Sequence, residues 1–254
     1  MSGHSKWATI HRAKEVTDQK RGQAFTKITN AIIIAVRESG GVTDPNSNFK
    51  LRLALDKARE VNMPKDNVQR AVDRATGAAG AGTMEEMVYE GFAPGGVAVM
   101  IEAATDNRQR TVQEVRNLLD RAGGSLGGSG SVSFMFKKFG FLGISKSSGS
   151  EETMLKLMDL GVDDVEEGDE EIEAYICVDK FEEVKKRISD AGITVTKSEL
   201  TYRPITLVPV NDSKVAARIL VLLEKLEAHD DVMKVHANFD IPDNILEQAK
   251  SEAI

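Results

Sequence analysis

The chain has 254 residues, of which 41% are hydrophobic and 29% charged, and its formal net charge is −7. This composition is typical of a water-soluble globular protein, and the length favours two or three domains. The single cysteine, Cys177, rules out an intramolecular disulfide framework and a cysteine zinc cluster, and no apolar run reaches the roughly 20 residues of a membrane span. We therefore expect a cytoplasmic protein without a secretory signal, a membrane partner or a bound metal.

The first 77 residues predict three helices. Apolar residues recur at helical spacing over residues 25–35, 51–58 and 68–75. Pro64 suits the first turn of the third helix, and Gly77 suits its end.

From residue 86 onward the pattern changes to strands alternating with helices. Strand-like runs at 87–89 and 97–101 precede a helix that begins after Asn107, and a further strand is predicted at 132–136. Residues 141–202 then follow the order strand, helix, strand, strand, helix, strand, which is the ferredoxin-like order.

The last helix and strand, at 213–228 and 232–237, are too few to form a domain, so we expect them to join the strands of the middle region. The prediction is an α+β fold with an N-terminal helical domain followed by two small α/β (ferredoxin-like) domains, the middle one discontinuous. The predicted boundaries are 1–79 for the basic helical domain, 80–137 plus 205–240 for the middle domain, 138–204 for the inserted acidic domain and 241–254 for a C-terminal tail.

The charge is concentrated in segments of opposite sign. Residues 1–77 hold 14 basic and eight acidic side chains, a net charge of +6, whereas the remainder holds 19 basic and 32 acidic ones, a net charge of −13. This asymmetry predicts an anion-binding module joined to acidic domains. Residues 151–183 carry 14 acidic side chains against Lys156 and Lys180, which predicts either a well-solvated face or a docking surface for a basic partner.

No constellation of catalytic residues stands out. The phosphate-binding loop, metalloprotease and nucleophile-elbow motifs do not occur, and the four histidines (His4, His11, His229 and His236) are not at metal-ligand spacing. We expect a non-enzymatic protein without a cofactor, a catalytic site or a metal site.

The N-terminal segment is the strongest candidate for nucleic-acid binding. Its tryptophan can stack on a base, and the clustered cations around it can neutralise phosphates. Packing of this tryptophan within the helical domain is the alternative. The predicted contacts are Lys6, Trp7, His11, Arg12, Lys14, Lys20, Arg21 and Lys27.

A glycine-rich loop is the second candidate. Its backbone amides are of the kind that bind phosphate, but the loop follows a helix and precedes a strand, the reverse of a phosphate-binding loop. A flexible connector and a contact loop therefore both remain open. The loop consists of Gly127, Gly128, Ser129, Gly130 and Ser131.

Several motifs occur in a fixed order along nearly the whole chain. They are Gly3–Ala8, Lys20–Gly22 with Phe25–Lys27, Asn62–Asn67, Tyr89–Gly96, Thr105–Arg108 with Arg110-Thr111, and Gly123–Gly127 continuing to Gly130–Val132. In these motifs the sequence resembles the YebC/PmpR family, which includes mitochondrial translational activators. The resemblance implies three domains, a helical one and two α/β ones. It also implies either a DNA-binding transcriptional regulator or a ribosome-associated translation factor, some of which relieve stalling at proline-rich stretches.

These observations favour a regulator of gene expression that binds nucleic acid, either duplex DNA or ribosomal RNA, through its basic helical domain. No helix-turn-helix signature with a clear recognition helix is present, so we expect contacts mainly to phosphate, which suit structured RNA at least as well as duplex DNA. A translation factor bound to the ribosome and a protein-interaction scaffold are the alternatives.

Overall fold

The computed structural model describes residues 18–77, 84–146, 150–168 and 171–252. Contacts between them define two compact units, one formed by the described residues up to Met135 together with those from Thr206 onward, the other by Phe136–Ile205. In the described part of the chain, no helix has both the length and the apolar character that crossing a membrane requires.

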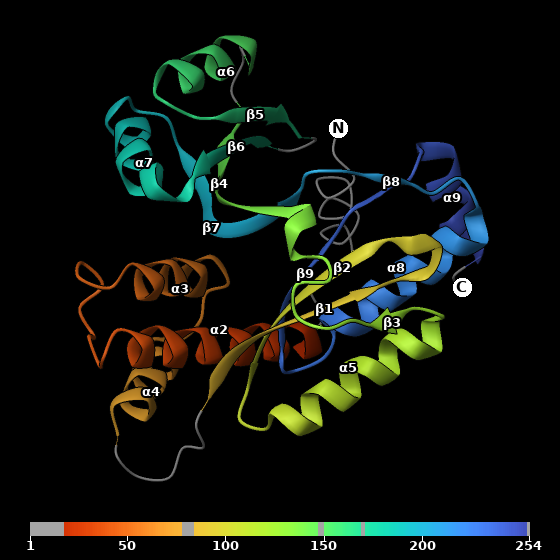
Figure 1. Cartoon of the computed structure of the whole chain (residues 1–254). Helices are drawn as coiled ribbons and strands as arrows, with labels where there is room; N and C mark the ends of the chain where they lie inside the picture. The colour runs from red at the N-terminus through yellow and green to blue at the C-terminus, as the bar shows by residue number, and fades with distance from the viewer. Residues whose placement is uncertain (1–17, 78–83, 147–149, 169–170, 253–254) are drawn as a thin grey trace. The chain divides into compact units, whose positions relative to one another are not determined.

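Three helices open the first unit, as the sequence predicts: α2 (Asp18–Glu38), α3 (Phe49–Glu60) and α4 (Lys65–Thr76). Both α3 and α4 pack against α2 (Figure 1). One stripe of α2, including Ile28 and Ile32, lies in the core shared with these two helices, whereas Ile33 is buried outside that core. Ile33 is buried because α2 also packs against a strand of the neighbouring sheet. A helix covered on two sides has no polar face there.

Asn48 joins the end of α2 to the start of α3. Its side-chain oxygen accepts a hydrogen bond from the Leu51 amide at 3.0 Å and so caps α3. Its Nδ2 donates to the carbonyl oxygens of Ala35 and Val42, both at 2.9 Å. The buried amide therefore closes the turn between the two helices.

A four-stranded antiparallel sheet with the order β3-β1-β2-β9 forms the other part of the first unit. Helices α5 and α8 pack against this sheet and against each other, and α9 packs on α8 (Figure 1). Strands β8 and β10 pair with each other as a separate, short parallel sheet. The elements are β1 (Glu85–Phe92), β2 (Ala98–Thr105), α5 (Arg108–Ala122), β3 (Ser125–Leu126), β8 (Val208–Pro209), α8 (Ser213–Glu227), β9 (Val232–Ala237), β10 (Phe239–Asp240) and α9 (Asp243–Glu252).

The strand predicted at 132–136 is wrong. Ser133–Met135 forms a 3-10 turn, and the strand begins only at Phe136. The apolar residues of this segment resemble a strand, but the amides of Val132 and Ser133 bond to a side chain instead of a neighbouring strand.

The second unit has the predicted ferredoxin-like order. Its antiparallel sheet has the strand order β5-β6-β4-β7. Helix α6 packs against β5 and β6, and α7 packs against β6. Gly140 permits close approach of α7, since a Cβ there would lie 1.9 Å from Cδ2 of Phe181. The elements are β4 (Phe136–Ser145), α6 (Ser150–Asp159), β5 (Asp164–Glu167), β6 (Glu171–Cys177), α7 (Phe181–Asp190) and β7 (Val195–Pro204).

The α+β fold class is confirmed, including the discontinuous middle region. Strand β9 pairs with β2 although the whole second unit lies between them in sequence. The boundaries proposed for three domains stay a prediction, because the contacts group the helices and the first sheet into one unit.

Candidate nucleic-acid interface

The residues predicted to bind nucleic acid fall into two groups. Lys6, Trp7, His11, Arg12 and Lys14 lie outside the described residues. Lys20 and Arg21 belong to the first turns of α2, and the Arg21 side chain is exposed to solvent. The start of α2 is thus the part of this predicted surface that the structure describes.

Lys27 makes a different contact from the one that the sequence predicts. Its Nζ donates to the carbonyl oxygen of Glu227 at 2.5 Å, and Gln23 Nε2 donates to the carbonyl oxygen of Ala228 at 3.1 Å. Both acceptors lie at the C-terminal end of α8, where carbonyl groups lack helical partners and carry partial negative charge. Burial lowers the pKa of Lys27, and the neighbouring Glu227 only partly offsets this effect. Lys27 therefore joins α2 to α8.

Other cations of the helical region differ in how much of their charge is already paired. The ammonium of Lys50 lies 2.6 Å from Glu38 and 2.9 Å from Glu86. Lys65 and Arg74 on α4 are exposed and form no ion pair with another described residue. These two cations remain available to an anionic partner.

The glycine-rich loop surrounds a buried carboxylate. Glu90 of β1 is 6% exposed and accepts hydrogen bonds from the amides of Gly130, Val132 and Ser133 at 2.7–2.8 Å. Burial alone would raise the pKa of Glu90, but these amides outweigh it and hold the pKa below its ordinary value. The amide of Gly127 donates to the carbonyl oxygen of Glu90 at 2.8 Å. The amide of Ser131 donates to the carbonyl oxygen of Gly128 at 3.2 Å, so three of the five loop amides are unavailable to a phosphate.

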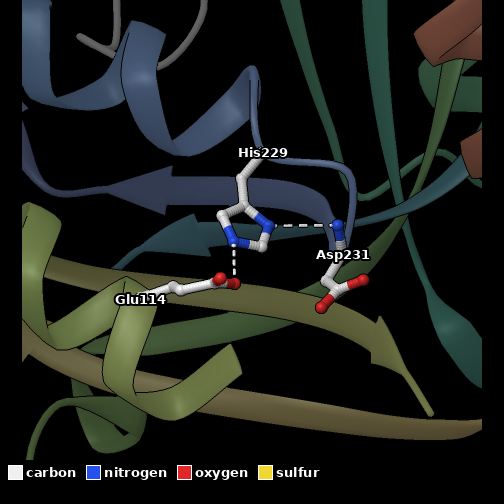
Figure 2. Close-up of side chains that lie close together, drawn as sticks. All are labelled: Glu114, His229 and Asp231. Atoms are coloured by element: carbon white, nitrogen blue, oxygen red, sulfur yellow. Dashed lines mark hydrogen bonds and ion pairs between the residues drawn. The ribbon is translucent and has the colours of Figure 1, made fainter. Parts of the chain in front are cut away.

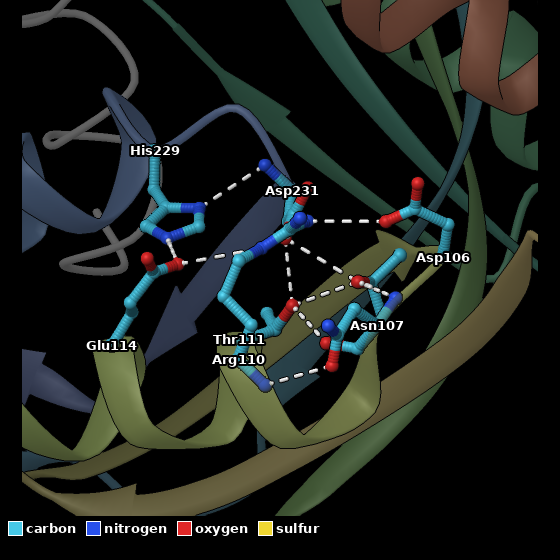
Figure 3. Close-up of polar contacts among 8 residues, drawn as sticks. Asp106, Asn107, Arg110, Thr111, Glu114, His229 and Asp231 are labelled. Atoms are coloured by element: carbon cyan, nitrogen blue, oxygen red, sulfur yellow. Dashed lines mark hydrogen bonds and ion pairs between the residues drawn. The ribbon is translucent and has the colours of Figure 1, made fainter.

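Sequence reasoning missed a polar network at the start of α5 (Figure 3). Asp231, at the start of the last strand of the sheet, accepts hydrogen bonds from Thr111 Oγ1 at 2.6 Å and from Arg110 at 2.8 Å. Thr105 Oγ1 accepts a hydrogen bond from the Asn107 amide at 2.9 Å, and the Asn107 side chain caps α5 by accepting from the Arg110 amide at 3.1 Å. The network fixes the start of α5 against the turn between α8 and β9. Only the cap itself was visible in the sequence.

Glu114, His229 and Asp231 bring three metal-ligand types together, within 4.8 Å of one another (Figure 2). His229 Nδ1 accepts the Asp231 amide at 3.1 Å, so the neutral ring carries its proton on Nε2 and donates it to Glu114 at 2.8 Å. The Asp231 carboxylate is engaged by Thr111 and Arg110. The hydrogen bonds account for all three residues without a metal ion.

Two models of one family cover most of the chain. The model described as TACO1/YebC protein N-terminal domain matches residues 5–78, and the model described as TACO1/YebC second and third domain matches residues 84–239. The chain belongs to the TACO1/YebC family. Its resemblance to YebC/PmpR proteins, inferred from sequence motifs, is thereby confirmed.

Full-length relatives carry the name probable transcriptional regulatory protein. The relative from Syntrophomonas wolfei is 46% identical over 249 residues, covering 97% of this chain and 99% of the relative. The relative from Roseiflexus castenholzii is 48% identical over 253 residues, with 98% of each chain covered. The crystal structure of a conserved hypothetical protein from Aquifex aeolicus aligns with a TM-score of 0.83 at 40% identity, covering 89% of this chain and 93% of that one.

Several TACO1/YebC motifs of this chain have structural roles. Asn62 adopts a left-handed backbone conformation just before α4, and Asn107 caps α5. A Cβ at Gly91 would lie 2.6 Å from the carbonyl oxygen of Ser125, and one at Gly124 would lie 2.2 Å from that of Phe92. These motif residues are required by tight packing and turns, so their presence identifies the fold more directly than a binding site.

Proposed function

We propose that this TACO1/YebC protein is a non-enzymatic regulator of gene expression that binds nucleic acid through its basic N-terminal region. The observation that carries the proposal is the net charge of +6 in residues 1–77 against −13 in the remainder. The relatives' name, probable transcriptional regulatory protein, supports the same class of function. Duplex DNA is the target that this name favours.

The contacts proposed are Lys6, Trp7, His11, Arg12, Lys14, Lys20 and Arg21. Cations bind the phosphate backbone without reading sequence, so affinity depends strongly on salt and selectivity comes from nucleic-acid shape. The acidic remainder repels phosphate and thereby orients the bound molecule. Lys27 is left out of the contact set, because its ammonium already binds Glu227. In the glycine-rich loop only the exposed residues Gly128, Ser129 and Gly130 enter the proposal.

A translation factor that binds ribosomal RNA is the second candidate, since phosphate contacts guided by shape suit a folded RNA as well as duplex DNA. The deciding experiment measures equilibrium binding of the full chain to a duplex DNA and to a structured ribosomal RNA fragment at several salt concentrations. Co-sedimentation with ribosomes at moderate salt is measured in parallel. Preference for duplex DNA and absence from ribosomal fractions support the transcriptional role, and the reverse supports the translational one. Binding to neither nucleic acid contradicts the proposal.

A further inference from the structure

Helix α6 presents an apolar pair to solvent. Leu155 is 65% exposed and Met158 57% exposed, and their spacing of three residues places them on the same helix face. On the other side of α6, Leu157 is fully buried. The helix therefore has an apolar face that packs in the unit and a second apolar face that no described residue covers.

Carboxylates surround this second face. Glu151 lies one helical turn before Leu155, and Asp159 directly follows Met158. Neither carboxylate forms an ion pair with another described residue, whereas Glu152 is paired with Lys156 at 2.8 Å. Two large apolar side chains are thus flanked by unneutralised negative charge.

The edge strand β5 packs beside α6 and contains three acidic residues among its four. Asp164 and Glu166 are paired with Arg203, and Glu167 with Lys146. Glu151 and Asp159 of α6 therefore supply the unneutralised charge beside the apolar pair. Residues 151–173 hold 11 acidic side chains, and Lys156 is the only basic one. A nucleic acid would be repelled here, and a second copy of the chain docking through the same face would bring like charges together.

We propose that the face of α6 formed by Glu151, Leu155, Met158 and Asp159 is a docking surface for a partner protein, which contributes an amphipathic helix with apolar and basic residues. Such a helix buries its apolar side chains against Leu155 and Met158 while its cations meet the flanking carboxylates. The negative charge of the surface favours a partner helix that carries basic residues. The proposal does not depend on nucleic-acid binding by the N-terminal region.

The test measures binding of the full chain to a fluorescent 18-residue helical peptide of leucine and lysine, by fluorescence anisotropy. A leucine and glutamate peptide and a lysine and serine peptide of equal length serve as probes of charge and apolar character. The double variant Leu155→Ser/Met158→Ser is expected to weaken binding of the first peptide about tenfold or more, because two apolar side chains no longer become buried. Glu151→Gln/Asp159→Asn is expected to reduce the dependence of this affinity on salt.

The matched control is Ile205→Ser, which removes an apolar side chain that is 66% exposed elsewhere in the same unit. It should leave peptide affinity unchanged, and thermal melting should confirm that every variant is folded. Equal affinity of the wild type and the Leu155→Ser/Met158→Ser variant overturns the proposal, as does an absence of binding or equal binding of the glutamate peptide. Loss of self-association or of RNA binding in that variant, with unchanged peptide binding, would assign the face to a second copy or to RNA and would also overturn it.

Discussion

At the scale of single residues, Glu90 determines what the glycine-rich loop can bind. A loop of this composition can offer its amides to a phosphate, but here the amides of Gly130 and of the next residues, Val132 and Ser133, surround an internal carboxylate. The loop is therefore held in one conformation by a buried charge. No sequence pattern predicts this, because Glu90 lies about 40 residues away from the loop and reaches it only through strand pairing.

Replacing this carboxylate tests its role directly. Glu90→Gln leaves one acceptor oxygen and places an NH2 group among backbone donors, so we expect a loss of about 2–4 kcal/mol in the free energy of unfolding. Urea denaturation measures this loss. Glu85→Gln is the matched control on the same strand, where the carboxylate is half-exposed and 3.7 Å from Arg108, and it should change stability by less than about 0.5 kcal/mol. Equal stability of both variants would contradict the role assigned to Glu90.

Two carboxylates should make stability sensitive to acid. The pKa values of Glu90 and Asp231 are raised by burial, but hydrogen bonds lower them more, so both lie below their ordinary values of 4.5 and 3.8. Their contribution to stability is present above these ordinary values and is lost as pH falls through the lower values of the folded state. In urea denaturation at pH 5, 4 and 3, the wild type should lose more stability than Glu90→Gln. Equal losses of stability in the wild type and in Glu90→Gln would contradict the acid sensitivity assigned to Glu90.

At the scale of elements, the sequence predicted the helices best where one face alone is buried. It also predicted the ferredoxin-like order, since turns and strands alternate clearly after residue 141. It missed the second buried side of α2, represented by Ile33, because packing against a sheet depends on contacts remote in sequence. A strand was wrongly predicted at 132–136 for the same reason. Propensity describes a segment, whereas a buried carboxylate from another strand determined that segment's conformation.

Gly140 tests the packing of α7 on the second sheet. The ring of Phe181 is fully buried and cannot move away from an added Cβ, so Gly140→Ala should destabilise the protein by about 1–3 kcal/mol. Gly22→Ala is the control, since nothing lies within 4 Å of a Cβ there; at this exposed position of α2 it should stabilise by about 0.5–1 kcal/mol. Chemical denaturation distinguishes the two. A neutral Gly140→Ala variant would show that α7 packs less closely than described.

Lys27 tests whether the cations of α2 divide between nucleic-acid binding and packing against α8. Because its ammonium binds a carbonyl at the end of α8, Lys27→Gln should leave the salt dependence of nucleic-acid affinity unchanged. Fluorescence anisotropy at a series of salt concentrations checks this, and the melting temperature shows whether the variant is folded. A reduced slope in the folded variant would restore Lys27 to the contact set.

At the scale of the whole molecule, the net charge of −7 conceals a division between a basic N-terminal region and an acidic remainder. The sequence alone revealed this division, because it needs only the order of charged residues. Which cations meet the partner could not be predicted equally well, as Lys27 shows. In the acidic part, the proposed docking surface includes the exposed pair on α6.

Binding of nucleic acid by the N-terminal cations can be measured through the salt dependence of affinity. The variant Lys6→Ala/Lys14→Ala/Lys20→Ala/Arg21→Ala is compared with a control in which four exposed lysines elsewhere, Lys180, Lys186, Lys214 and Lys225, are replaced by alanine. For duplex DNA, each lost phosphate contact should reduce the slope of log affinity against log salt by about 0.9, or roughly 3–4 in all. The control should keep the wild-type slope. An unchanged slope in the first variant, or an equal reduction in the control, would contradict the account.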